Sequence, residues 1–474
     1  MQGKLNLIAD KAKQNPNMKF TALIHHINAD NLLQCYNELK RNKVCGIDGV
    51  TLDEYGINLN ENIKLLVQKL RTKEYRHKPV RRVYIPKPGK EEKRALGIIA
   101  LEDKLVQLMA KKILEPIFEP KFLECSHGFR PGLSCHTAIH ALNHTIMKEP
   151  VNYVVEVDIR KFFDKISHYW LLRCIEERVA DPNMIWLMKR FLKAGIVESG
   201  VYEDSEQGTI QGGVISPLYA NIYLHYVLDL WFNKIILPKA RDKMQLIRYC
   251  DDFVVCCANK KDAEEFLEKL KIRLKKFNLE VAEDKTKIIK FGRTEWKRRK
   301  SNQEKSDSFT FLGFTHYLGT TRKGWFSVKH KTAKQNLQMK LRSIKEWLKK
   351  IRNIQTLKEW WPVLKVKLLG HYRYYGVSGN FRCINQFYNQ VINMVFKWIN
   401  RRSQKKSMNW LQYLKYLDWN PLPKPQIYYQ MYNTTPLTYG NASLKSPVWE
   451  NHQQGSVRAP IAMKEYLINK LNKE

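Results

Sequence analysis

The sequence predicts an α+β fold. Apolar residues follow helical spacing near the N-terminus and over much of the last third, whereas two apolar runs, 151–164 and 246–258, are rich in β-branched and aromatic residues and predict strands. Hydrophobic residues make up 44% of the 474 residues. That share excludes wholesale disorder and suffices for the cores of about two to four folding units.

The first 150 residues are expected to form helices and then paired strands. Residues 1–75 carry helical apolar spacing, as in 31–40. Residues 76–100 predict two strands joined by a turn, and residues 101–120 predict a helix that ends at Glu115-Pro116 because proline interrupts helical hydrogen bonding.

Two adjacent carboxylates interrupt the apolar run 246–258, in the motif Tyr249-Cys250-Asp251-Asp252. The run predicts a strand, a tight turn and a second strand. Burying two like charges at such a turn is unfavourable unless a cation neutralises them, and Mg²⁺ takes carboxylate oxygens and nucleotide phosphates together. The alternative is a pair of turn aspartates that cap an exposed hairpin.

A second apolar run, 151–164, carries Asp158 where its strand is expected to end. Three carboxylates from two neighbouring strands can hold two metal ions. Such a pair lowers the charge on an attacking hydroxyl and stabilises a leaving pyrophosphate. The pattern therefore favours a metal site over the turn-capping alternative.

The charge of the chain favours a polyanionic partner over a merely soluble basic surface. The net charge is +36 and the pI is about 9.7. Residues 331–474 contain 25 Lys and Arg against 6 Asp and Glu, an excess of 19. Nucleic acid is the expected partner, with affinity that falls steeply as salt rises.

Aromatic and basic residues alternate in the C-terminal part, which suits base stacking and phosphate contacts. Aromatic stripes on helices are more often core, so Tyr372, Tyr374 and Trp398 are assigned mainly to packing. Four cations are better candidates for RNA contact. They are Arg401, Arg402, Lys405 and Lys406.

The nine cysteines include no CxxC pair, which makes a zinc finger an unfavoured reading. Their odd number and their place in apolar runs are typical of reduced thiols. The chain has no N-terminal signal peptide and no long uncharged apolar stretch, so a cytoplasmic protein without a membrane partner is expected.

The ordered motifs over roughly residues 30–430 resemble the reverse transcriptases of the group II intron-encoded, maturase type. The matching blocks are Gly46-Ile47-Asp48-Gly49, Tyr84-Ile85-Pro86-Lys87-Pro88, Arg94-Ala95-Leu96-Gly97-Ile98, Gly128-Phe129-Arg130-Pro131-Gly132, 157–164, 208–217, Tyr249-Cys250-Asp251-Asp252, Glu283-Asp284-Lys285-Thr286-Lys287 and Phe311-Leu312-Gly313-Phe314. The resemblance implies an RNA-directed DNA polymerase with two Mg²⁺ ions, for which Mn²⁺ can substitute, and a maturase role in splicing and retrohoming.

The resemblance also implies a right-hand polymerase architecture of fingers, palm with an antiparallel sheet, and helical thumb. After the extension at 1–75, the fingers are expected at 76–150 and the palm, with interleaved fingers segments, at 151–330. The thumb is expected at 331–400 and a basic RNA- or DNA-binding region at 401–474. No cysteine follows Cys383, so a bacterial type without the zinc-dependent HNH endonuclease is expected.

Residue roles carry over from the matching motifs. The resemblance makes Asp158, Asp251 and Asp252 the catalytic metal ligands and adds Ile159 to the metal set. It places Arg130 and Gly313, the latter in the primer-grip motif, against nucleic acid. The partners implied are an RNA template, intron RNA, a DNA primer or target, and a deoxynucleoside triphosphate (dNTP), with a monomer or a homodimer as the active form.

Five residues are implied in dNTP binding. Lys87 and Arg94 would contact the triphosphate, for which surface basicity is the alternative. Phe163 would lie against the sugar and exclude a 2′-hydroxyl, unless it only packs in the core. Gln211 belongs to a glycine loop that approaches the nucleotide, and Lys285 would protonate the pyrophosphate, unless it is a solvated helix end.

The sequence departs from the family pattern at Cys250, Ile210 and Ala95, where the family commonly has Ala, Pro and Pro. Ala95 predicts a less rigid hairpin, and the other two would tune nucleotide fit or mark a subgroup. Two other functions remain open. One is a domesticated reverse transcriptase in phage defence, repair or a CRISPR locus; the other is an RNA-binding splicing cofactor with a vestigial polymerase.

Overall fold

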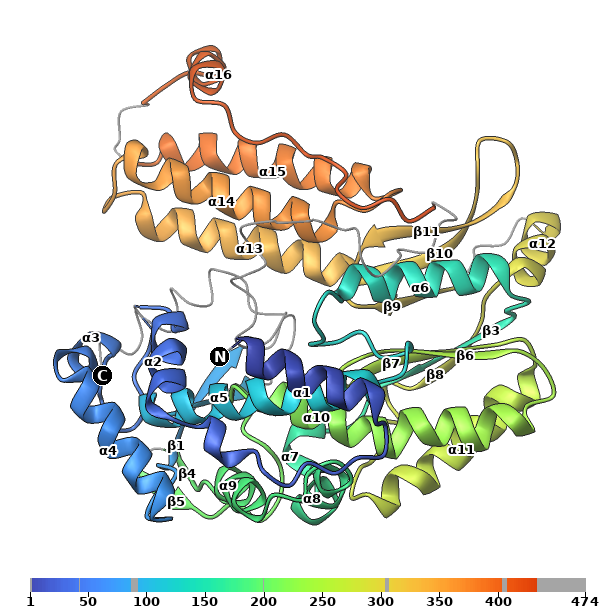
Figure 1. Ribbon diagram of the computed structural model, residues 1–474. Coiled ribbons are helices and arrows are strands. Elements are labelled where there is room, and N and C mark those ends of the chain that lie inside the picture. The colour runs from blue at the N-terminus through green and yellow to red at the C-terminus, as the bar shows by residue number, and fades with distance from the viewer. Residues whose placement is uncertain are drawn as a thin grey trace.

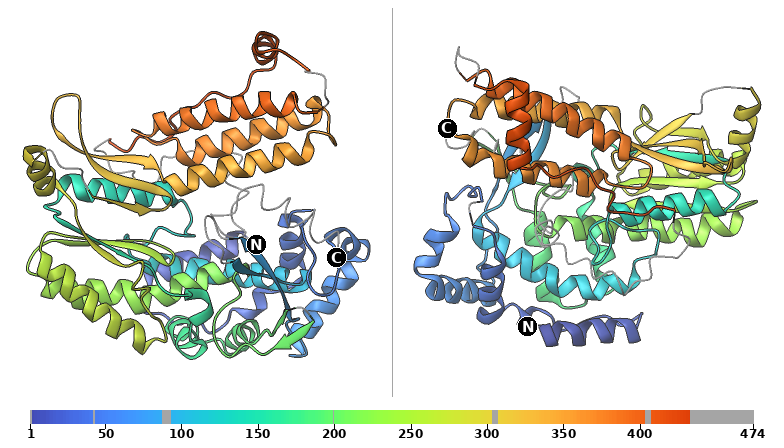
Figure 2. Two further views of the ribbon diagram at one scale, coloured as in Figure 1. Left: turned by 180° about the vertical axis from the view of Figure 1, so that it is seen from behind. Right: turned by 90° about the horizontal axis from the view of Figure 1, so that it is seen from above.

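The computed structural model describes residues 2–41, 43–86, 93–198, 200–302, 307–402 and 407–432, and it confirms the mixed α+β class. Helices α13, α14 and α15 lie side by side as one layer. In the view of Figure 1 the N-terminal helices lie below this layer, and Figure 2 shows the same arrangement from behind. Two large hydrophobic cores hold these parts together, and a third, small cluster lies at Val80, Ile99 and Ala194.

Helices fill the N-terminal part, as expected. Their caps follow from the sequence: Thr51 and Glu54 form a capping box that satisfies backbone N–H groups at the start of the third helix. The long helix α5 (Leu101–Phe118) continues two residues past Pro116, because a proline in the last turn leaves only one helical hydrogen bond unmade. The other helices are α1 (Gln2–Gln14), α2 (Ala29–Glu38), α3 (Leu52–Ile57) and α4 (Leu59–Arg71).

The two strands predicted within 76–100 are confirmed. Strands β1 (Val80–Pro86) and β2 (Lys93–Ile98) pair antiparallel, with Ile85 opposite Arg94. The sheet order is β2-β1-β4-β5, where β4 (Ile196–Glu198) and β5 (Val201–Glu203) come from far along the chain.

A central antiparallel sheet in the order β6-β7-β3-β8 separates the two cores. Because side chains alternate along a strand, Val155 and Val255 face one core while Val154 and Val254 face the other. The strands are β3 (Tyr153–Val157), β6 (Met244–Tyr249), β7 (Asp252–Cys257) and β8 (Lys287–Lys290).

Helices cover both faces of the central sheet. Helix α6 (Cys135–Lys148) belongs to the core shared with the C-terminal helices, and α11 (Lys260–Lys276) to the other core. The remaining helices of this part are α7 (Phe162–Lys165), α8 (His168–Glu176), α9 (Pro182–Leu192), α10 (Ser216–Leu224) and α12 (Arg293–Asn302).

The C-terminal part joins a three-stranded sheet to a layer of helices. Tyr372 and Trp398 are buried there, and the Tyr374 hydroxyl donates to the Leu312 carbonyl at 3.0 Å, so the predicted packing role of these aromatics is confirmed. The elements are β9 (Ser308–Phe311), β10 (Phe314–Thr320), β11 (Phe326–Thr332), α13 (Lys334–Ile351), α14 (Leu357–Tyr375), α15 (Phe381–Ile399) and α16 (Trp410–Trp419).

Four buried histidines, three in the C-terminal part and His136 in α6 against it, make this region sensitive to acid. Burial lowers the pKa of His136 and His330 to about 4 and that of His371 to about 3, and it lowers the pKa of His316 well below its usual range. The unfolded chain takes up protons on these histidines below about pH 6.5, whereas the folded protein does not. The free energy of unfolding should therefore fall between pH 7 and pH 5.5, by about 1 kcal/mol for each histidine.

Urea unfolding at several pH values tests this expectation. A His316→Phe variant keeps a ring stacked on Phe309, whose centroid lies 4.9 Å away, and should lose its share of the pH dependence. Equal slopes for the variant and the wild type would contradict the assignment.

No helix among the described residues combines the length and the apolar character needed to cross a bilayer.

Candidate active site

The motif Tyr249-Cys250-Asp251-Asp252 forms the tip of a tight hairpin, as predicted. Tyr249 pairs with Asp252, so Cys250 and Asp251 are the two loop residues. Cys250 has a φ of 58°, a left-handed conformation that non-glycine residues adopt at a cost, and it is buried. A buried loop residue argues against an exposed hairpin whose aspartates only cap the turn.

Strand pairing brings the second carboxylate strand to this hairpin. Strands β3 and β7 are antiparallel neighbours with Val157 opposite Phe253. Continuing the register by one residue places Asp158 opposite Asp252, and adjacent strands lie about 4.8 Å apart. The two aspartates thus share one end and one face of the sheet.

Glu156 is a further acid on that face, which sequence reasoning missed. It lies two residues before Asp158, so both side chains point to the same side of β3. The pKa of Glu156 is raised to about 7, chiefly by burial, with Lys287 opposing the rise and the charges of Asp252 and Asp158 adding to it. The alternation of β3 was the signal that could have identified it.

Lys285 reaches the same cluster from the loop before β8. Its Nζ atom lies 2.6 Å from the Asp158 Oδ2 atom, and both side chains are partly exposed. The backbone holds this arrangement, because the Ala282 N–H donates to the Asp158 carbonyl at 2.8 Å and the Lys285 N–H donates to the Ala282 carbonyl at 3.0 Å. The structure therefore brings Lys285 to Asp158, one of the predicted metal ligands.

The carboxylates themselves do not converge into a ready metal site. Among the described residues, no three His, Cys, Asp or Glu side chains lie together as metal ligands would. The physical reason at Asp158 is that an ammonium group already neutralises it. The donors still suit a hard divalent ion, since they are carboxylate oxygens whose mutual repulsion calls for a cation. Ile159, which is buried, could add only its main-chain carbonyl oxygen.

A small cleft near the first sheet contains part of the predicted nucleotide site. Its volume is about 140 Å³, and Ala95 and Gly97 of β2 line it together with Gln211. The Gly97 N–H donates to the Gln211 carbonyl at 2.8 Å. Gly212 has a φ of 112°, and a Cβ atom there would lie 2.9 Å from the Gly97 carbonyl oxygen, so the loop needs glycine at this position.

Two other residues predicted to bind the nucleotide, Arg94 and Phe163, are not among the described residues that line this cleft. Arg94 lies on β2, the edge strand of the first sheet. The backbone of Phe163 lies next to the cleft, since its carbonyl accepts a hydrogen bond at 2.7 Å from the N–H of Thr209, which lines the cleft. The Phe163 ring contacts Phe162, with centroids 5.3 Å apart. Lys87 lies outside the described residues.

The Arg130 side chain forms contacts within the protein, and its role against nucleic acid stays a prediction. It is 8% exposed, forms an ion pair with Glu119 at 2.8 Å, and donates to the carbonyls of Leu123 and Ser126. The donors that would have gone to a phosphate are used inside the protein. Arg130 therefore supports the loop that carries it.

The remaining predicted nucleic-acid residues lie in the C-terminal part. Gly313 has a φ of 80° in the turn between β9 and β10, and a Cβ atom there would lie 2.7 Å from the Asn336 Nδ2 atom. Arg401 stacks over Trp398 at 5.6 Å, and Arg402 donates to the Gln355 carbonyl at 3.1 Å. Lys405 and Lys406 lie outside the described residues.

Comparison with known proteins finds relatives that match the part of the chain with the hairpin aspartates, Asp158 and Lys285. The family model described as "Reverse transcriptase (RNA-dependent DNA polymerase)" matches residues 85–316. The "Group II intron-encoded protein LtrA" of Lactococcus lactis subsp. cremoris is 29% identical over 467 residues, which cover 81% of this chain and 75% of the relative.

Two further relatives match shorter parts. "Protein YkfC" of Escherichia coli (strain K12) is 32% identical over 51% of this chain and 71% of its own length. The "Uncharacterized 91 kDa protein in cob intron" of Schizosaccharomyces pombe is 35% identical over 47% of this chain and 28% of its own length.

Proposed function

Because the chain belongs to the reverse transcriptases of the group II intron-encoded type and is an RNA-directed DNA polymerase, we propose that Asp158, Asp251 and Asp252 hold its divalent metal ions. The observation that carries this proposal is the register of β3 and β7, which sets Asp158 opposite Asp252 at the hairpin tip. Divalent-metal dependence is general in this family; the choice of two Mg²⁺ ions, with Mn²⁺ as a substitute, belongs to the proposal.

Two such ions would lower the charge on the primer 3′-hydroxyl and stabilise the leaving pyrophosphate. The residues of the chain supply the frame for this step. Asp252 and Asp158 offer carboxylate oxygens from neighbouring strands, Asp251 offers a third from the loop, and Ile159 offers its carbonyl oxygen. The left-handed Cys250 orients the two adjacent aspartates.

The dNTP is proposed to lie between this hairpin and the first sheet. Arg94 and Lys87 would neutralise its phosphates, and Arg can do so with two parallel hydrogen bonds. Gln211, whose loop packs on β2, would contact the nucleotide, and Phe163 would lie against the sugar and exclude a 2′-hydroxyl. In the same proposal residues 76–150 are fingers, 151–330 palm, 331–400 thumb and 401–474 an RNA-binding region.

Lys285 is proposed to have two opposing effects. Its ammonium pairs with Asp158, where it would compete with a metal ion, and the same group would protonate the pyrophosphate. A Lys285→Met variant should therefore lower kcat by about 10²-fold while it decreases the Mg²⁺ concentration needed for half-maximal activity.

Primer-extension rates over a Mg²⁺ titration test this prediction. Lys271→Met is the matched control, because Lys271 pairs with Glu268 on the surface of α11 at 3.1 Å. An unchanged kcat for Lys285→Met would exclude the proton-transfer role, and an unchanged Mg²⁺ requirement would exclude competition at Asp158.

The maturase role belongs to the same proposal. The C-terminal third carries an excess of 19 positive charges, and Arg401 is exposed at the end of α15. Two of the three relatives are named as intron proteins, so neither a domesticated defence enzyme nor a cofactor with a vestigial polymerase is favoured. Intron RNA, an RNA template, a DNA primer and dNTP are the proposed partners.

RNA splicing assays can separate the two activities. The Asp252→Asn variant should stimulate splicing of its intron RNA as well as the wild type does, because metal binding at the hairpin does not enter RNA recognition. Replacing Arg401 and Arg402 with Gln should weaken RNA binding and reduce its salt dependence. Splicing that fails in Asp252→Asn would contradict this separation.

A further inference from the structure

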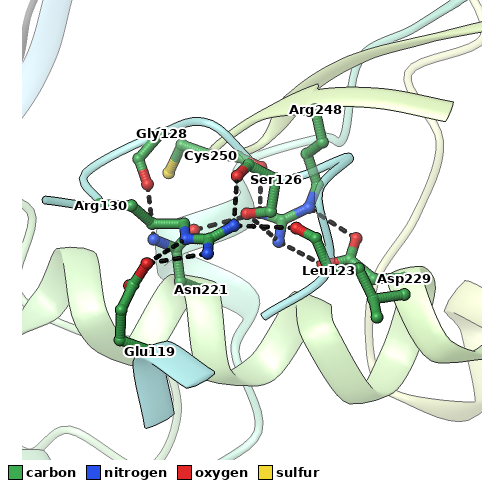
Figure 3. A network of polar contacts seen from close by, with 9 residues as sticks. All are labelled: Glu119, Leu123, Ser126, Gly128, Arg130, Asn221, Asp229, Arg248 and Cys250. Atoms are coloured by element: carbon green, nitrogen blue, oxygen red, sulfur yellow. Dashed lines mark hydrogen bonds and ion pairs between the residues drawn. The ribbon is translucent and has the colours of Figure 1, made fainter. Parts of the chain in front are cut away.

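The aspartate hairpin rests on one buried arginine whose hydrogen-bonding capacity is fully used. Arg248 of β6 has no exposed surface, and each of its five N–H donors meets an acceptor (Figure 3). Asp229 accepts two of these bonds at 2.7 and 2.5 Å, Ser126 Oγ one at 2.8 Å, Asn221 Oδ1 one at 3.1 Å and the Cys250 carbonyl one at 3.0 Å.

The bond to Cys250 reaches the hairpin loop directly. The Cys250 carbonyl belongs to the peptide group that joins Cys250 to Asp251. A hydrogen bond to this carbonyl therefore fixes the orientation of the peptide plane and of the Asp251 backbone nitrogen in it. Cys250 itself is in the left-handed region, which persists only where surrounding contacts enforce it. The hydrogen bonds of Arg248 are the contacts that hold Cys250 in this conformation.

The same network holds the segment that packs beneath the loop. The Asn221 side-chain amide, which accepts from Arg248, donates to the Gly128 carbonyl at 2.6 Å. A Cβ atom on Gly128 would lie only 2.4 Å from the Cys250 backbone nitrogen. Backbone bonds flank Arg248 as well, with its N–H donating to Cys125 and its carbonyl accepting from His127. The hairpin and this segment are therefore one rigid unit.

Asp229 comes from a distorted helix. It is the last residue of a π-helical segment, His225–Asp229, that follows α10, and it has no exposed surface. π-Helical insertions are rare and often mark functional sites, because they change the direction of one side chain. This one brings Asp229 against the arginine.

Stability alone does not account for the pair. Two charges with no contact to solvent lose their hydration, and a well-packed apolar pair of similar volume commonly stabilises a protein as much or more. What a forked arginine adds is a fixed geometry that a lysine, with three donors on a flexible stem, cannot reproduce.

We propose that Arg248 and Asp229 are a positioning pair for nucleotidyl transfer, which sets the orientation of the Asp251-Asp252 hairpin for its metal ions. This inference rests on the proposed metal-binding role of Asp251 and Asp252. Neither side chain of the pair has exposed surface, so both would act through Cys250 and the Asn221–Gly128 contact.

Two variants test the pair in the full-length protein with an RNA template and a DNA primer. Arg248→Lys keeps the charge but loses the fork, and Arg248→Met combined with Asp229→Leu removes both charges together. Each should lower kcat at least about tenfold and raise the half-maximal Mg²⁺ concentration several-fold. RNA affinity and the KM for dNTP should stay within about twofold of wild type.

Arg178→Met is the matched control. Arg178 is also buried, but it donates to the carbonyls of Asn15 and Ala12, away from the hairpin. The Arg178→Met variant should have a lower melting temperature than the wild type and the same Mg²⁺ requirement for activity. A similar Mg²⁺ shift in this control would reduce the effect to general destabilisation and overturn the proposal.

The remaining outcomes also decide the question. A folded double variant with wild-type kcat and Mg²⁺ dependence overturns the proposal. If both Arg248 variants fail to melt cooperatively, Ser126→Ala, which removes one acceptor, decides instead: a raised Mg²⁺ requirement supports the pair and an unchanged one refutes it. Asp251→Asn is run in parallel, because activity that survives it would refute the metal site itself rather than the pair.

Discussion

Asp252→Asn and Asp251→Asn should each lower primer extension on RNA by about 10³-fold or more. Asn keeps the size of the side chain but removes the charge, and a metal ion held by neutral oxygens loses most of its attraction to the site. Asp252 is expected to be the more severe of the two, because it lies opposite Asp158 across the paired strands.

Single-turnover extension of a labelled primer in Mg²⁺ measures this effect. Glu283→Gln is the control, since its side chain is exposed and pairs with Lys271 at 3.3 Å instead of facing the hairpin. RNA binding should be unchanged in all three variants. Extension at more than about a tenth of the wild-type rate in either aspartate variant would be incompatible with the proposed chemistry.

Gly128→Ala should reduce kcat by about 10²-fold although Gly128 touches no substrate. The added methyl group would lie 2.4 Å from the Cys250 nitrogen and 3.0 Å from the Tyr249 carbonyl carbon, both of which are backbone atoms. Because neither can rotate away, the hairpin must move, and a displacement near 1 Å at a reacting centre costs about that factor.

Gly370→Ala provides the control for a glycine replacement. Gly370 lies inside α14 with open space where its Cβ atom would be, so alanine there should raise the free energy of unfolding by about 0.5–1 kcal/mol and leave extension unchanged. Wild-type kcat and Mg²⁺ dependence in Gly128→Ala would show that the hairpin tolerates movement and would contradict the rigid support described above.

Features that depend on neighbouring residues could be predicted from the sequence. The β6–β7 hairpin follows from two apolar runs, rich in β-branched and aromatic residues, on either side of two aspartates, and β3 follows from a similar run. The glycine at 212 was recognisable as a site of close backbone approach. Helix α5 extends two residues past its predicted end, because a proline in the last turn of a helix is tolerated.

Features that depend on residues far apart in the chain could not be predicted from the sequence. The ion pair between Lys285 and Asp158 joins residues 127 positions apart, and the family resemblance assigns a separate role to each residue without indicating that they pair. Arg130 reads as a basic loop residue, and its partner Glu119 becomes evident only in three dimensions. Arg248 was visible as a charge within an apolar strand, but nothing local identified Asp229 as the group that neutralises it.

Counting bound metal ions tests the central claim most directly. Mn²⁺ titration, followed by electron paramagnetic resonance, can be done on the protein with an RNA template, a chain-terminated primer and the next dNTP. The proposed site predicts about two ions per complex for the wild type and fewer for Asp158→Asn and Asp252→Asn. The same number of ions, bound with the same affinity, in wild type and variants would show that these carboxylates are not the metal ligands.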